Sequence, residues 1–165
     1  MKTLEMQLIV VGFDGSPAAA AALEWAVAEA RLTGARVEAV YAWDPSPIVA
    51  SGSAVPDWRP LREAAERYAA RAVRGVVGVD GDVQVTPKMV IGRPAQVLLA
   101  ASAGADLLVV GSRGIGGLEG ELGSISQHCA AYAECPVVVI RHDPLRRRHL
   151  VWAGSSVAAG GGARA

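Results

Sequence analysis

Glycines follow an apolar stretch of this sequence in a pattern that suits phosphate binding. The run Asp106–Val110 leads into Gly111-Ser-Arg-Gly114, and the pair Gly123-Ser124 comes shortly afterwards. Glycines let a backbone approach an anion closely, and the first turn of a helix offers free N–H groups and a positive dipole end. Ser124 is suited to be the N-cap of that helix, with a hydroxyl that could also reach a phosphate oxygen. The pattern predicts a nucleotide-binding loop between a buried strand and a helix.

The sequence lacks the motifs of the common nucleotide-dependent and hydrolytic enzymes. A P-loop requires Gly-Lys-Ser/Thr, but the only lysines are Lys2 and Lys88. The pair Gly114-x-Gly116 has Glu119 where a dinucleotide fingerprint has its third glycine, and it follows the fourth expected strand instead of the first. The sequence contains neither a Gly-x-Ser-x-Gly elbow nor a His-Glu-x-x-His motif. We therefore expect no catalytic residue and no metal site.

The elements that must position this loop follow from hydrophobic periodicity and from stop signals. Ser16 is a suitable N-cap, Pro17 a suitable first helical residue and Gly34 a suitable stop. Strands are expected at 7–13, 36–42, 82–91, 106–110 and 136–140, and helices at 17–32, 61–77, 92–102 and 124–132. Strands that alternate with helices indicate a parallel sheet with helices on both faces. Pro87 predicts an edge position or a bulge for the third strand.

Composition narrows the class of protein. The chain has 165 residues, 52% of them hydrophobic, which suits a single packed domain. Sixteen basic and sixteen acidic residues cancel, so we expect no nucleic-acid partner. No apolar run approaches the length of a membrane span, so we expect no membrane partner. Cys129 and Cys135 are expected to be free thiols in a cytoplasmic protein. Residues 143–165 form an Arg-, Gly- and Ala-rich C-terminal tail.

Three sequence features together resemble the universal stress protein family. They are Asp14 after the first strand, Gly92-x-Pro94 before the third helix, and the glycine loop with the later run Cys135–Arg141. The resemblance covers about residues 6 to 141 and implies a single domain over 6–142. The implied fold is an open five-stranded parallel α/β sheet in the order 3-2-1-4-5, of the adenine nucleotide alpha hydrolase-like type. ATP would lie across the carboxyl ends of the strands, where the winding reverses.

The resemblance also implies roles for individual residues. Asp14 would bind the ribose hydroxyls, Gly12 and Phe13 with Val40 or Tyr41 would border the base, and the glycine loop and the start of the next helix would enclose the phosphates. The full expected set is Gly12, Phe13, Asp14, Val40, Val110, Gly111, Arg113, Gly114, Gly123, Ser124, Ile125 and Ser126. Alternatives stay open at this point. Asp14 could only cap the following turn, and Arg113 could project into solvent.

One departure from the family pattern concerns the length of the glycine loop. ATP-binding members place nine residues between the second glycine and the Gly-Ser pair, whereas Ile115 to Leu122 is eight residues. One residue fewer shortens the reach of the loop by up to about 3.5 Å. Glu121 also places a carboxylate in the loop, where it would repel phosphates that it faced.

The expected function is that of a stress-response regulatory protein that binds ATP and acts as a homodimer. Family members commonly pair through the fifth strand, which here contains Val137, Val138, Val139 and Ile140. Two alternatives remain: a dimeric scaffold that does not bind ATP, favoured by the shorter loop, and a slow ATP hydrolase. Weak hydrolysis would be compatible with Mg²⁺ bound through the phosphates alone.

Overall fold

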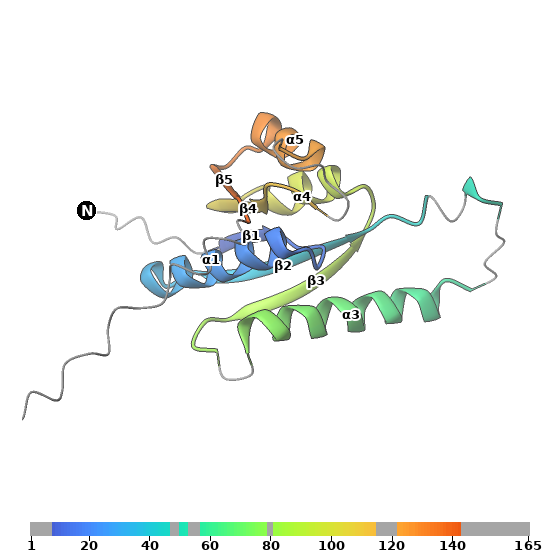
Figure 1. The fold of residues 1–165 in the computed structure, drawn as a ribbon, viewed down its shortest axis with the longest axis horizontal. Coiled ribbons are helices and arrows are strands. Elements are labelled where there is room, and N and C mark those ends of the chain that lie inside the picture. Colours follow the sequence, from blue (N-terminus) through green and yellow to red (C-terminus); the bar gives the residue numbers. More distant parts are fainter. Residues whose placement is uncertain (1–7, 47–49, 53–56, 79–80, 115–121, 143–165) are drawn as a thin grey trace, which may run out of the picture.

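Five parallel strands form the centre of the protein, in the order β3-β2-β1-β4-β5 (Figure 1). The computed structural model describes residues 8–46, 50–52, 57–78, 81–114 and 122–142. The strands are β1 (Leu8–Gly12), β2 (Arg36–Trp43), β3 (Val85–Ile91), β4 (Leu107–Gly111) and β5 (Val137–Ile140). The parallel pairing and the strand order confirm the predicted fold class. Pro87 lies in β3 at the sheet edge, where its missing N–H costs no ladder bond.

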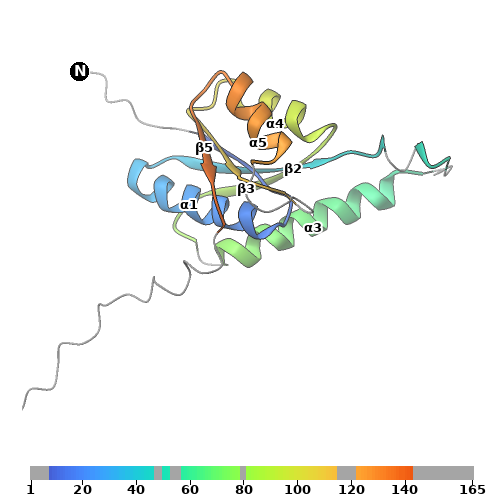
Figure 2. The same cartoon turned by 45° about the horizontal axis from the view of Figure 1, so that its top comes forward.

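Helices cover both faces of this sheet (Figure 2). They are α1 (Pro17–Thr33), α3 (Arg59–Val77), α4 (Pro94–Ser102) and α5 (Ser124–Tyr132). α1 and α3 bury their apolar residues against one face, in a cluster that includes Leu23 and Val73. α4 and α5 cover the other face, in a second cluster that includes Leu98 and Cys129. The sheet therefore separates two apolar layers, as expected for an α/β protein.

The central strands β1 and β4 belong to both layers. Val10 and Leu108 face the α4 side, while Val11 and Val109 face the α1 side, and all four are fully buried. Burial on both faces explains why each of these strands is an uninterrupted apolar run instead of an alternating one. The carboxyl ends of β1 and β4 therefore follow directly on fully buried strand residues.

The start and end of α1 follow the signals in the sequence. The Ser16 side chain accepts a hydrogen bond from the Ala19 N–H at 3.2 Å, and Pro17 is the first helical residue. Gly34 ends the helix with φ +76°, and its N–H donates to the Ala30 carbonyl at 2.8 Å. The predicted N-cap and stop of this helix are confirmed.

Some predicted boundaries differ from the structure. The third strand begins at Val85 instead of residue 82, and α3 begins at Arg59 instead of Leu61. Residues 115–121, with Glu121, and the proposed tail 143–165 lie outside the described residues, so the domain limit at 142 stays a prediction. Within the described part of the chain, no helix has both the length and the apolar character needed to cross a membrane.

Candidate functional site

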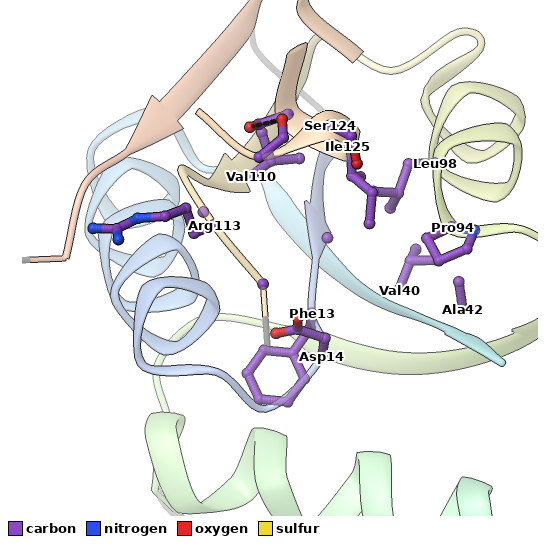
Figure 3. Close-up of a pocket in the computed structure, with 15 residues that line it drawn as sticks. Phe13, Asp14, Val40, Ala42, Pro94, Leu98, Val110, Arg113, Ser124 and Ile125 are labelled. Atoms are coloured by element: carbon purple, nitrogen blue, oxygen red, sulfur yellow. Dashed lines mark hydrogen bonds between the residues drawn. The ribbon is translucent and has the colours of Figure 1, made fainter. Parts of the chain in front are cut away.

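A cleft of about 370 Å³ opens at the carboxyl ends of β1 and β4 (Figure 3). The chain runs from β1 to β2 on one side and reaches β4 on the other, so the cleft marks the reversal of winding where ligands bind in open α/β sheets. Its lining residues are Gly12, Phe13, Asp14, Val40, Ala42, Pro94, Leu98, Val110, Gly111, Arg113, Gly114, Gly123, Ser124, Ile125 and Ser126. The structure thus brings together every residue of the expected set.

Asp14 follows β1 at the floor of the cleft. Its Oδ1 accepts a hydrogen bond from the Ser16 N–H at 2.9 Å, which ties the turn before α1. Its Oδ2 faces the glycine loop, because a Cβ built on Gly114 would stand only 2.6 Å from that oxygen. The capping interpretation of Asp14 is therefore correct for one oxygen, while the other lies towards the residues that follow β4.

Two glycines of the cleft allow the strand ends to pack closely against neighbouring helices. A Cβ on Gly111 would lie 2.8 Å from the carbonyl carbon of Ala18, so the end of β4 and the first turn of α1 require glycine for their contact. A Cβ on Gly12 would lie 2.8 Å from Cδ1 of Leu98, on the α4 side. Both glycines have a packing role whatever the cleft binds.

α5 begins at the predicted residue, but its N-cap differs from the prediction. The N-cap is Gly123, with φ −64° and ψ 154°, and Ser124 is the first helical residue, so the assignment of Ser124 as the N-cap is wrong. No side chain caps this helix, and the N–H groups of its first turn have no partner within the helix. These N–H groups belong to Ser124, Ile125 and Ser126, which line the cleft.

Ser126 connects the first turn of α5 to the residue that follows β4. Its buried hydroxyl lies 2.8 Å from the Gly123 carbonyl oxygen and 3.1 Å from the Ser112 carbonyl oxygen, both of which accept its hydrogen bond. The Ser112 carbonyl also accepts the Gly123 N–H at 2.7 Å, and the Ser112 N–H donates to Ile140 in β5 at 2.7 Å. Ser126 therefore fastens α5 to the end of β4, and its backbone N–H is what it offers to the cleft.

The sequence model of the universal stress protein family matches residues 6–141, most of the chain. The chain belongs to the universal stress protein family. It is 38% identical over 142 residues to Universal stress protein Rv1996 of Mycobacterium tuberculosis, covering 82% of this chain and 45% of that protein. This chain therefore spans about half the length of the curated relatives it matches.

Solved structures of the family have the same fold. This universal stress protein is similar to UspA from Lactobacillus plantarum, with a TM-score of 0.67 and 26% identity over 84% of this chain and 100% of that one. It is also similar to a universal stress protein crystallised in complex with cAMP, with a TM-score of 0.57 and 27% identity over 83% of this chain and 98% of that one. At least one neighbour with this fold thus binds an adenine nucleotide.

The two ends of the cleft differ in polarity in this universal stress protein. Val40, Ala42, Pro94 and Leu98 form an apolar end between β2 and α4, as Figure 3 shows. Of the two candidates in β2, Val40 lines this end, whereas Tyr41 packs against Tyr68 with ring centroids 5.8 Å apart. The opposite end consists of glycines and the first turn of α5.

Arg113 lines the cleft, but its guanidinium does not point into it. Figure 3 shows its guanidinium directed away from the other labelled residues, while the start of its side chain borders the cleft. Within the described lining, Asp14 and Arg113 are the charged residues, so a phosphate would meet mainly backbone N–H groups. Among the described residues, no group of three or more His, Cys, Asp or Glu side chains is placed to hold a metal ion.

The sequence did not predict three lining residues. Ala42 comes from β2, and Pro94 and Leu98 come from α4. Pro94 belongs to the Gly92-x-Pro94 motif before the third helix, which carries part of the family resemblance. Ala42 follows from Val40 by strand alternation, because residues two apart point to the same face of the sheet.

Proposed function

We propose that the cleft binds an adenine nucleotide, with ATP as the preferred ligand, and that the protein is a stress-response regulator controlled by its occupancy. The observation that carries the proposal is the set of groups that line the cleft: apolar side chains between β2 and α4, the Asp14 carboxylate, and the glycines with the open first turn of α5. A base, a ribose and phosphates need these three environments. A volume of about 370 Å³ also lies within the usual range of ligand pockets.

Each part of the nucleotide has a suitable partner under this proposal. Val40, Pro94 and Leu98 would pack against the adenine ring, and the Asp14 carboxylate would accept hydrogen bonds from the ribose hydroxyls. Gly111, Gly114 and the N–H groups of Ser124 to Ser126 would hold the phosphates at the positive end of α5. Mg²⁺, where present, would be held through the phosphate oxygens.

The residues of this cleft favour regulation by bound nucleotide over efficient hydrolysis of ATP. Phosphoryl transfer depends on cationic and basic groups positioned at the γ-phosphate. The described lining holds one carboxylate, which we assign to the ribose, and one guanidinium that points away. We therefore propose hydrolysis that is at most weak. The balanced charge and the free cysteines support a cytoplasmic protein that binds neither nucleic acid nor membrane.

Assembly through β5 forms the second part of the proposal. β5 lies at the edge of the sheet, and its four residues are all partly exposed. An exposed apolar edge strand favours pairing with another chain. We assign the homodimer contact to Val137, Val138, Val139 and Ile140.

Calorimetric titration of nucleotide-free protein with Mg-ATP, beside AMP, tests the ligand. Micromolar ATP binding that exceeds AMP binding is expected. Absence of heat with both nucleotides, on a folded protein, would favour the alternative that the eight-residue loop has abolished binding and that the protein is a dimeric scaffold. Insertion of one residue after Glu121 is the matched variant, because ATP binding that appears only there would identify loop length as the cause.

A further inference from the structure

The turn that carries Asp14 has a neighbour on the side away from the cleft, namely Tyr68 of α3. Gly15, which follows Asp14, has φ +83°, and a Cβ built on it would run into Oη of Tyr68. The Tyr68 hydroxyl therefore lies directly against the backbone of the turn. In Figure 3 this turn lies between the labelled cleft residues and the green ribbon of α3. Tyr68 itself is not among the residues that line the cleft.

Tyr41 of β2 packs against the ring of Tyr68. The rings of Tyr41 and Tyr68 have centroids 5.8 Å apart and an interplanar angle of 60°, a favourable tilted contact. Burial raises the pKa of Tyr41, and the charges of Tyr68 and Asp14 raise it further. The ring of Tyr41, which packs on Tyr68, thus lies on the face of the sheet opposite to Val40, and the Asp14 carboxylate is near enough to influence its pKa.

The Asp14 carboxylate is held from several directions. The Ser16 N–H holds Oδ1, and Gly114 lies against Oδ2. Gly15 adds little restriction of its own to the turn, because glycine has more conformational freedom than any other residue. The Tyr68 hydroxyl fills the space beside that backbone and so restricts its movement on that side.

We infer that Tyr68 is a positioning residue for Asp14, and that α3 through Tyr68 sets the preference of the cleft for ribonucleotides over 2′-deoxyribonucleotides. The inference rests on the proposed function, in which Asp14 binds the ribose. A carboxylate gains both charge-assisted hydrogen bonds only when it faces both ribose hydroxyls. If the turn shifts at Gly15, the Asp14 carboxylate can accept a hydrogen bond from one ribose hydroxyl at most. The protein then no longer distinguishes ribose from 2′-deoxyribose.

The test compares AMP with 2′-deoxy-AMP in calorimetric titrations of the full chain. Wild-type protein should prefer AMP by about tenfold or more, the usual value of a hydrogen bond to a charged group. Tyr68→Phe retains the ring that packs on Tyr41 and removes only the hydroxyl, and it should bring the ratio of affinities close to one. Tyr68→Ala should do the same. Tyr132→Phe is the matched control, because Tyr132 is an exposed tyrosine at the end of α5, and it should leave the ratio unchanged.

The outcomes separate this inference from the proposed function. If wild-type protein binds neither of these nucleotides nor Mg-ATP, the proposed function fails and the role of Tyr68 falls with it. If it binds ATP alone, the same comparison is made with ATP and 2′-deoxy-ATP. If wild-type protein prefers AMP and both Tyr68 variants retain that preference, only the inference is overturned. Equal affinity of wild-type protein for the two sugars would also overturn it, because Asp14 would then not distinguish the 2′-hydroxyl. Circular dichroism and thermal unfolding verify that each variant is folded.

Discussion

Oδ2 of Asp14 lies so close to Gly114 that a Cβ on the glycine would stand 2.6 Å from the oxygen. Asp14 follows β1 and Gly114 follows β4, the two strands on either side of the reversal of winding. The contact therefore joins the two loops that would bind the ribose and the phosphates. Its closeness leaves no room for a side chain at Gly114 unless the carboxylate moves.

Gly114→Ala should lower affinity for adenine nucleotides by about tenfold or more, because the added methyl displaces the Asp14 carboxylate that would bind the ribose. The Gly114 backbone is outside the left-handed region, so the change tests space and not backbone strain. Gly75→Ala is the matched control, since Gly75 in α3 has open space where a Cβ would be added. Calorimetry of both variants checks the result, and equal affinities would contradict the proposed importance of the contact.

The two roles of Asp14 can be separated by two substitutions. Asp14→Asn keeps an oxygen that can accept the Ser16 N–H, so stability should change little, but nucleotide affinity should fall by about tenfold or more without the charge. Asp14→Ala should lose the same affinity and, in addition, about 0.5–1.5 kcal/mol of unfolding free energy. Urea denaturation and calorimetry measure the two quantities. An Asn variant that binds as well as wild type would leave Asp14 with its capping role alone.

Every residue of the expected set lines the cleft, whereas some other lining residues were not in that set. The cleft contains Asp14, which the family resemblance implied, and the glycine loop, whose pattern is local; Ser16 and Gly34 were predicted because capping is local. Leu98 was not predicted, since its place at the cleft depends on the packing of α4. Tyr68 lies in a helix with no sequence signal that links it to Asp14. The strand order itself came from the family resemblance, because hydrophobic patterns do not encode neighbours in a sheet.

The sequence near the start of α5 offers two serines that could cap the helix, Ser124 and Ser126. Both Ser124 and Ser126 have hydroxyls suited to the end of a helix, and the sequence alone favoured the one beside Gly123. The buried carbonyl groups of Ser112 and Gly123 are the acceptors that the Ser126 hydroxyl satisfies. The hydrogen bond from Ser126 to Ser112 is a long-range contact that the local sequence pattern does not reveal.

Gly111→Ala should destabilise the protein by about 1–3 kcal/mol, the usual cost of overpacking. The added Cβ would lie 2.8–3.0 Å from backbone and Cβ atoms of Ala18, and a helix cannot shift as easily as a side chain. Gly12→Ala should cost less, because its Cβ would meet the end of the Leu98 side chain, which can change rotamer. Urea denaturation of both variants compares them. A larger loss for Gly12→Ala would contradict this account of the walls.

The two thiols should react at different rates. Cys129 is fully buried and Cys135 is half-buried, and both are free. Burial raises the pKa of each thiol, so the thiolate fraction at neutral pH is below that of an exposed cysteine. Reactivity should therefore rise about tenfold per pH unit below those pKa values, with Cys135 modified first. Kinetics with an aromatic disulfide reagent measure this, and Cys135→Ser should leave only the slow phase. One common rate for both thiols in folded protein would contradict the prediction.

Pairing through β5 can be tested by removing a single backbone donor. Leu108 and Ser112 of the β4 segment donate their N–H groups to the carbonyls of Pro136 and Ile140. Backbone groups alternate between the two edges of a strand, so those of Val137 and Val139 face the free edge. Val139→Pro therefore removes an edge N–H and keeps the β4–β5 ladder.

Val139→Pro should convert a dimer to a monomer in light scattering while the protein remains folded. The matched variant is Leu32→Lys, a charge placed on an exposed apolar residue of α1 instead of β5, and it should leave the dimer intact. A Val139→Pro dimer as stable as wild type would show that β5 does not pair through its backbone. If Val139→Pro is a monomer, nucleotide titration of that variant decides whether the cleft depends on assembly. This chain supplies apolar side chains, the Asp14 carboxylate and the first turn of α5 to the cleft, so we expect binding to persist.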